Sequence, residues 1–145
     1  MLAIAGWGWH AETAVRILRL ALSGALDRHP QLKLLIGHMG EGLPTMMERI
    51  ERVFGSYSNT HLERNASRAI VEQVWVSTGG FSSMPAFLAA LMTFGADRLL
   101  FSVDYPFGNN VAAVAFLKNL PVSPEDREKI ANKNADALLR LAPRQ

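Results

Sequence analysis

The stretch LLIGHMGEGLP, residues 34–44, joins an apolar run directly to two polar residues, His38 and Glu41. An apolar run without clear alternation of polar residues is typical of a parallel strand that is covered on both faces. The three glycines of the stretch allow a sharp turn and leave room for a ligand beside it. We therefore expect a buried strand over residues 31–37 whose carboxyl end presents His38 and Glu41.

Two further strands are predicted from β-branched and aromatic residues, over residues 73–78 (QVWVST) and 98–104 (RLLFSVD). Helical spacing of apolar residues, with Gly and Pro at the ends, predicts helices around these strands. The helices are expected over residues 12–26, 43–55, 84–95, 109–120 and 123–141, with Ser123 as an N-cap and with a loop and one helix in residues 56–72. This alternation predicts an α/β fold with parallel strands joined by right-handed crossovers.

Polar residues follow each predicted strand at the point where it ends. His38 and Glu41 follow the first strand, STGG at residues 77–80 follows the second, and DYPF at residues 104–107 follows the third. In parallel α/β folds, ligands bind outside the carboxyl ends of the strands. Three strands are therefore expected to deliver functional groups to one rim, including backbone N–H donors from the STGG segment.

The residues alone leave two interpretations open for each polar group at this rim. His38 and Glu41 are either a turn histidine with a glutamate at a helix start, or an acid/base pair in which Glu41 fixes the imidazole tautomer. In the second case His38 could also belong to a metal site. Asp104 either caps the following turn, or serves as a carboxylate ligand for a divalent metal or as a proton carrier.

Four other polar residues have a structural interpretation beside any functional one. Arg49, on the helix that starts near the rim, is either solvated or clamps a carboxylate with two hydrogen bonds. His10 follows Trp7 and Trp9 in GWGWHAE, and this aromatic surrounding favours a packed position over a metal ligand. His29 and His61 are expected to be structural or solvated.

The composition of the 145-residue chain excludes several classes of protein. A net charge of +2 with scattered Lys and Arg argues against a nucleic-acid partner, and no phosphate-binding glycine motif is present. No apolar segment approaches the ~20 residues that span a bilayer, so neither a membrane partner nor a signal peptide is expected. The absence of cysteine excludes disulfides and thiolate metal sites and fits a reducing, cytoplasmic location.

Four segments together resemble the amidohydrolase-related, metal-dependent decarboxylases, such as γ-resorcylate, 2,3-dihydroxybenzoate and 5-carboxyvanillate decarboxylases. These segments are residues 12–38, GHMGEGLPTMMERI at 37–50, RLLFSVDYPF at 98–107 and NADALLRL at 134–141. The resemblance covers nearly the whole chain. It implies the C-terminal portion, about strands six to eight with their helices, of a metal-dependent hydrolase-type TIM (β/α)₈ barrel.

The same resemblance implies a role for each rim residue. His38 matches the active-site acid/base group and Glu41 its partner, while Asp104 matches a metal ligand that also takes part in proton transfer to the ring. Arg49 matches a contact to the substrate carboxylate, and Phe107 a wall of the pocket. The implied enzyme is a carboxy-lyase that removes CO₂ without oxidation from a small hydroxylated aromatic carboxylate. It uses one divalent ion, Zn²⁺ or Mn²⁺, and forms a homo-oligomer.

The chain departs from the family in one respect. The other metal ligands of the family come from a Glu-x-His or His-x-His motif on the first strand and from a histidine after a central strand, and neither is present. Three strands cannot close a barrel of eight. We therefore expect residues 1–145 to form a partial amidohydrolase-like barrel domain that is inactive alone. Two alternatives stay open: a non-catalytic truncated paralogue that associates with another chain, and a metal-dependent hydrolase of the same superfamily.

Overall fold

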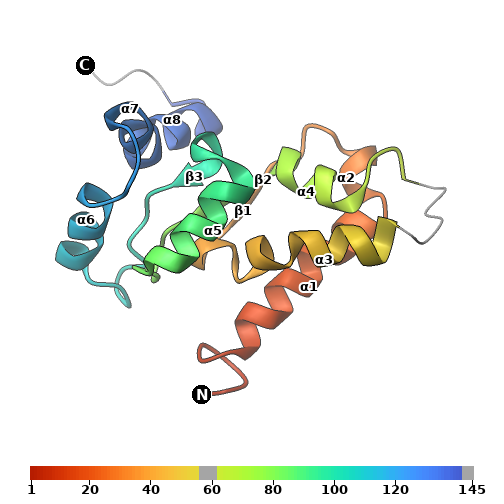
Figure 1. Cartoon of the computed structure of the whole chain (residues 1–145), viewed down its shortest axis with the longest axis horizontal. Coiled ribbons are helices and arrows are strands. Elements are labelled where there is room, and N and C mark those ends of the chain that lie inside the picture. Colours follow the sequence, from red (N-terminus) through yellow and green to blue (C-terminus); the bar gives the residue numbers. More distant parts are fainter. Residues whose placement is uncertain (56–61, 142–145) are drawn as a thin grey trace.

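A computed structural model describes residues 1–55 and 62–141 of the chain (Figure 1). In these ranges, helices alternate with three short parallel strands, which confirms the predicted α/β class. The strands are β1 (Leu34–Ile36), β2 (Val74–Ser77) and β3 (Leu99–Leu100). The helices are α1 (Gly8–Leu22), α2 (Ala25–Arg28), α3 (Leu43–Gly55), α4 (Ala66–Gln73), α5 (Met84–Phe94), α6 (Asn110–Lys118), α7 (Pro124–Glu128) and α8 (Asn134–Leu139). Single turns of other helix types cover His38–Gly40, Ala96–Arg98 and Lys129–Lys133.

The three strands lie side by side in the order in which they occur in the chain. Leu34 pairs with Val74 and Ile36 with Val76, and Val76 in turn pairs with Leu99, all in parallel. Helices α1 to α4 gather at one end of the molecule and α6 to α8 at the other, with the strands and α5 between them (Figure 1). Because all three strands run in one direction, the segments that follow them begin at the same edge of the sheet.

The hydrophobic core lies on one face of the sheet. Val74 and Val76 of β2 are fully buried there, as is Phe87 of α5. Each such side chain contributes roughly 1.5–3 kcal/mol by leaving water. The other fully or nearly fully buried large residues are Leu26, Met39, Leu43, Ile70, Leu99, Leu120 and Ile130. Nearly every element therefore contributes to one core.

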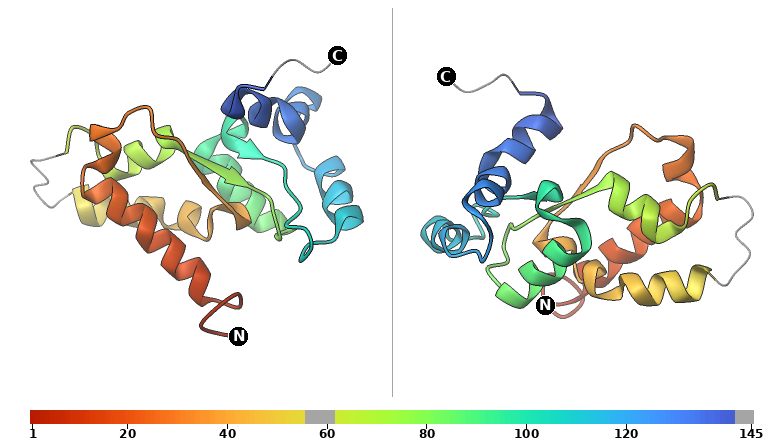
Figure 2. Two further views of the ribbon diagram at one scale, coloured as in Figure 1. Left: turned by 180° about the vertical axis from the view of Figure 1, so that it is seen from behind. Right: turned by 45° about the horizontal axis from the view of Figure 1, so that its top comes forward.

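The opposite face of the sheet is open at β1, which corrects the prediction that β1 is covered on both faces, but it is buried at Ser77 and Leu100 on the β3 side. Leu35 is 53% exposed, and it pairs with Trp75, which is only partly buried. Trp75 is covered by cations: the Arg98 guanidinium lies 4.0 Å from the ring centroid and the Lys33 amine 5.4 Å. Burial lowers the pKa of Arg98. The view from behind shows β1 and β2 in front of α5, with no helix over them (Figure 2, left).

The first predicted helix and the third predicted strand differ in their bounds from the observed elements. The helix predicted over residues 12–26 begins earlier, at Gly8, and breaks at Gly24, whose φ of 72° is left-handed. The strand predicted over residues 98–104 is limited to Leu99–Leu100. Its continuation pairs elsewhere, because the Phe101 N–H donates to the Ile130 carbonyl at 2.8 Å.

The helix predicted over residues 123–141 begins where expected but is not one continuous α-helix. The Ser123 hydroxyl accepts from the Asp126 N–H at 3.0 Å, which confirms the N-cap. The single helix predicted over residues 123–141 is instead α7, a π-helical turn and α8. The Asn134 amide donates to the carbonyls of Ala96 and Leu99, both at 2.7 Å, and so ties α8 to β3.

The loop and helix predicted over residues 56–72 are observed in part. Residues 56–61, including His61, lie outside the described ranges, and α4 begins at Ala66 and leads directly into β2. None of the helices in the described ranges combines the length and apolar character needed to cross a bilayer.

Arg64 connects α2 to the C-terminal end of α4. Its guanidinium donates to Asp27 at 2.8 Å, to Glu72 at 2.6 Å, to the Leu26 carbonyl at 3.1 Å and to Gln73 at 2.8 Å. Burial acts to raise the pKa of Asp27, but hydrogen bonds from Arg64 and from a backbone N–H outweigh it, so the pKa is lowered. The ion pair therefore holds these elements together with both groups charged.

We predict that Arg64→Met lowers the free energy of unfolding by about 1–3 kcal/mol, because buried acceptors lose their donor. The Asp27 carboxylate, whose side chain is only 7% exposed, would lose its guanidinium partner. Urea unfolding of the two proteins at neutral pH measures the difference. The control is Arg68→Met on α4, which removes the exposed ion pair that Arg68 forms with the same Glu72 and should change stability little.

The same pair predicts an acid dependence. A carboxylate with a lowered pKa stabilises the fold above its ordinary value, 3.8 for Asp27, and loses that contribution as the pH falls through the folded value. The stability difference between the wild type and Arg64→Met should therefore shrink below about pH 4. A difference that stays constant from pH 7 to pH 3 would contradict this account.

Candidate active site

The segment after β1 forms a left-handed turn. Five consecutive residues have positive φ: His38 at 48°, Met39 at 55°, Gly40 at 81°, Glu41 at 52° and Gly42 at 73°. Glycine adopts this conformation without cost, whereas the other three residues do so against a steric penalty. The turn folds the chain back on itself, and the side chain of Glu41 therefore lies beside that of His38.

His38 and Glu41 form the contact that the sequence suggested. The Nδ1 atom of His38 lies 2.5 Å from Oε1 of Glu41, whose side chain is only 10% exposed. A carboxylate can only accept, so Nδ1 carries the proton of this bond. In the neutral imidazole, the second nitrogen, Nε2, is then the one with a lone pair available for proton exchange.

Asp104 meets the other side of the same imidazole. Its Oδ2 atom lies 3.7 Å from Nε2 of His38. Its backbone carbonyl accepts from the N–H groups of Phe107 and Gly108, at 2.8 and 2.7 Å. The backbone carbonyl of Asp104 thus closes the turn that follows it, while its side chain faces His38.

Hydrogen bonds connect the loops after β2 and β3. The Thr78 N–H donates to the Leu100 carbonyl at 3.0 Å, and the Gly80 N–H to the Val103 carbonyl at 3.3 Å. The Thr78 hydroxyl donates to the Ser102 carbonyl at 2.9 Å and accepts from its N–H at 3.1 Å. The N–H groups of Thr78 and Gly80 are therefore used inside the fold, which corrects the prediction that STGG offers them to a ligand.

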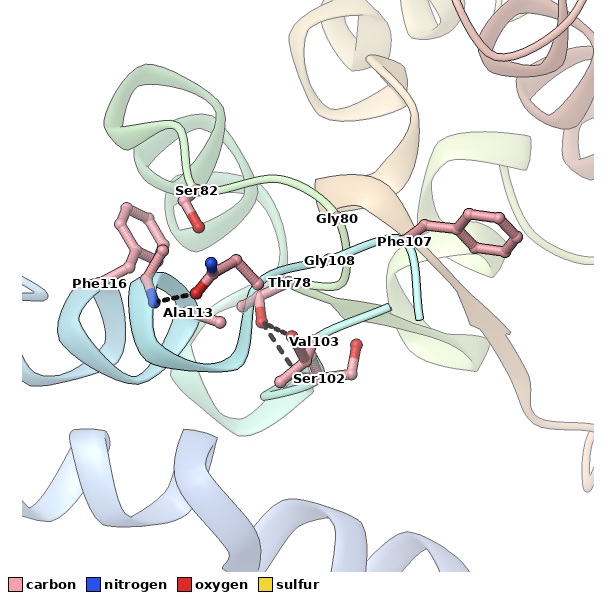
Figure 3. A pocket seen from close by; sticks show the side chains of 11 residues that line it. Thr78, Gly80, Ser82, Ser102, Val103, Phe107, Gly108, Ala113 and Phe116 are labelled. Carbon is pink, nitrogen blue, oxygen red and sulfur yellow. Dashed lines mark hydrogen bonds between the residues drawn. The ribbon is translucent and has the colours of Figure 1, made fainter. Parts of the chain in front are cut away.

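A pocket of about 250 Å³ lies between these loops and the start of α6 (Figure 3). Hydroxyl groups of Thr78, Ser82 and Ser102 contribute to its lining. Phe107 also borders it, but this side chain is 90% exposed and its ring points away from Ser82 and Thr78 in the close-up view. Its role as a wall of the substrate pocket stays a prediction.

Arg49 is on α3 and exposed to solvent. It is not among the residues that line the pocket, and its predicted contact with a substrate carboxylate stays a prediction. Of the five predicted site residues, the fold brings together His38, Glu41 and Asp104.

His10 is a neighbour of the site whose contact with Glu41 was not predicted from the sequence. Its ring packs against Trp7 with centroids 5.1 Å apart, in agreement with the packed position that was expected. Its Nδ1 atom also lies 3.6 Å from Oε2 of Glu41. The local sequence carries no signal for this contact, because α1 and the turn after β1 meet only in the folded chain.

The described residues do not form a complete metal site. No group of three or more His, Asp or Glu side chains in residues 1–55 and 62–141 is arranged to hold a metal ion. Protein zinc sites use three or four protein ligands. Asp104 offers a carboxylate, but one nitrogen of the neighbouring His38 is already bound to Glu41. The donor set of this chain is therefore too small by itself.

The fold agrees with comparisons to known proteins. A sequence profile of the amidohydrolase family matches residues 1–141, and the chain belongs to this family. It is 40% identical over 139 residues to a γ-resorcylate decarboxylase of Polaromonas sp., a match that covers 93% of this chain and 42% of that enzyme.

Solved structures of decarboxylases also have folds similar to that of this chain. The chain is similar to a dihydroxybenzoic acid decarboxylase from Polaromonas sp., solved with manganese and the inhibitor 2-nitroresorcinol, with a TM-score of 0.88, 36% identity and coverage of 97% and 43%. It is also similar to 5-carboxyvanillate decarboxylase from Sphingomonas paucimobilis, with a TM-score of 0.89, 28% identity and coverage of 95% and 42%. The chain thus spans about two-fifths of the length of these relatives.

Gly80 provides a test of the site geometry. A Cβ atom at this position would lie 2.8 Å from Oδ2 of Asp104 and 3.0 Å from Cδ2 of His38, and the φ of 69° disfavours any side chain. We predict that Gly80→Ala lowers the free energy of unfolding by about 1–2 kcal/mol from the backbone alone and separates the two side chains. Urea unfolding measures the first effect and a crystal structure the second.

Gly37 is the matched control, because a Cβ atom there meets nothing within 4 Å and its φ is −77°. Gly37→Ala should leave both the stability and the site unchanged. Equal effects of the two substitutions would show that the space beside Gly80 is not needed.

Proposed function

We propose that this chain is the catalytic C-terminal portion, about strands six to eight, of a TIM-barrel decarboxylase that acts on a hydroxylated aromatic carboxylate. The observation that carries the proposal is the cluster in which His38 contacts Glu41 through Nδ1 and faces Asp104 through Nε2. Membership of the amidohydrolase family and similarity to aromatic-acid decarboxylases support it. The short relative length of the match supports a partial barrel.

The three side chains suit the proton transfers of a non-oxidative decarboxylation. Glu41 holds the Nδ1 proton of His38, so Nε2 can take up a second proton from solvent and pass it to the Asp104 carboxylate, which returns His38 to its neutral form. Asp104 delivers a proton to the ring carbon that bears the carboxylate, and aromaticity is lost. The bond to the carboxylate then breaks, its electron pair restores the aromatic ring, and CO₂ leaves. The ring gains one proton and loses CO₂, so no oxidant is needed.

The metal requirement of the complete protein is part of this proposal. A related decarboxylase structure contains manganese, which supports one divalent ion, either Mn²⁺ or Zn²⁺. Asp104 would supply one ligand, and the remaining ligands would come from segments beyond these 145 residues. In the assembled pocket, Arg49 would contact the substrate carboxylate and Phe107 would contact the substrate ring. The complete enzyme would be a cytoplasmic homo-oligomer.

A chimera tests the proposed activity. The segment of the Polaromonas γ-resorcylate decarboxylase that precedes its match to this chain is fused ahead of Met1. With Mn²⁺ and 2,6-dihydroxybenzoate, the chimera should release CO₂, and His38→Gln or Asp104→Asn should reduce kcat by about 10²–10⁴-fold. A folded, manganese-loaded chimera without CO₂ release would contradict the proposal. Hydrolysis of a lactone without CO₂ release would instead support a hydrolase.

The chain alone should bind manganese weakly. Its described residues offer no group of three suitable ligands, so we expect no stoichiometric binding of Mn²⁺ by the 145-residue chain in equilibrium dialysis. The chimera is the positive control and should bind one ion. Tight stoichiometric binding by the chain alone would show that its own side chains complete a site.

A further inference from the structure

The buried carboxylate of Glu41 faces two imidazoles. Its Oε1 atom contacts Nδ1 of His38 at 2.5 Å, and its Oε2 atom lies 3.6 Å from Nδ1 of His10. The Glu41 side chain is shielded from water, while both histidine rings are partly exposed. The orientation of this carboxylate is therefore set mainly by its protein neighbours, and His10 is the neighbour of the oxygen that His38 does not use.

The surrounding residues leave a specific space for the His10 ring. Gly42, directly after Glu41, has no side chain, and a Cβ atom there would lie 2.1 Å from Cε1 and 2.7 Å from Nε2 of His10. On the other side, the Trp7 ring packs against the imidazole. The first turn of α1 thus inserts a ring against the turn that carries the acid/base pair.

We propose that His10 is a positioning residue for the His38–Glu41 pair, an inference that rests on the proposed role of that pair. A carboxylate can rotate about its terminal C–C bond, and an N–H that engages Oε2 keeps Oε1 turned toward His38. The separation of 3.6 Å is longer than a direct hydrogen bond but within the range of an ion pair or of a bridging water. His10 thereby maintains His38 in the tautomer with its proton on Nδ1.

Two substitutions separate this role from simple packing. His10→Phe keeps an aromatic ring against Trp7 but removes the N–H that faces Glu41. His10→Asn removes the ring and retains an N–H donor close to the position of Nδ1. A positioning role predicts that Asn preserves the state of His38 and Phe does not, whereas a packing role predicts the reverse.

The measurement is the tautomer of the neutral His38 ring by ¹⁵N NMR in the 145-residue chain, with the signals assigned from His38→Gln. We expect the wild type and His10→Asn to have mainly the Nδ1–H form, and His10→Phe to show at least a twofold larger fraction of the Nε2–H form. His29→Phe, at an exposed histidine, is the control and should change nothing.

An unchanged His38 tautomer in folded His10→Phe would overturn the proposal, as would a change in His10→Asn equal to that in His10→Phe. Thermal unfolding of each variant establishes that it is folded. Because the measurement uses neither substrate nor metal, it is independent of the chimera assay. Lack of decarboxylation together with the expected tautomer change would reject the proposed function and leave the positioning role intact.

Discussion

The left-handed turn after β1 is the constraint on which the site depends. Three non-glycine residues, His38, Met39 and Glu41, adopt positive φ, at a cost of the order of 1–2 kcal/mol each. Burial offsets this cost, because Met39 is only 2% exposed and Leu43, at the start of α3, is also buried. A strained backbone is thus held by the core on either side of it, and it brings Glu41 back against His38.

The contact between His38 and Asp104 depends on the lack of a side chain at Gly80, which lies between them. β2 lies between β1 and β3, so the loop after β2 must leave room for the side chains that come from the loops after β1 and β3. Gly80 does so, since a side chain there would collide with both groups. The hydrogen bonds of Thr78 then fix the β2 and β3 loops at a constant spacing. The cluster of His38, Glu41 and Asp104 therefore depends on the strained turn after β1, on Gly80, and on the hydrogen bonds between the loops after β2 and β3.

The sequence predicted those features that depend on neighbours in the chain. The bounds of α3, the Ser123 N-cap, the three parallel strands and the His38–Glu41 contact all follow from local patterns. The features that it did not predict depend on tertiary context. His10 meets Glu41 only when α1 docks, and the third strand is short because the Phe101 N–H donates to the distant Ile130 carbonyl. The roles of Arg49 and Phe107 require a bound substrate and are still predictions.

The open parts of the molecule and the incomplete metal site have a common explanation. β1 and β3 are the two edges of the described sheet, and among the described residues no helix covers β1 and β2 on the face with Leu35 and Trp75 (Figure 2, left). A parallel strand added at either edge would end at the same rim as His38 and Asp104, and its next residues would lie near both. Any segment that completed the sheet would therefore also be able to bring further ligands to Asp104. This geometric link supports a partial barrel over an independent domain, because it accounts for the unpaired edges and the shortage of ligands together.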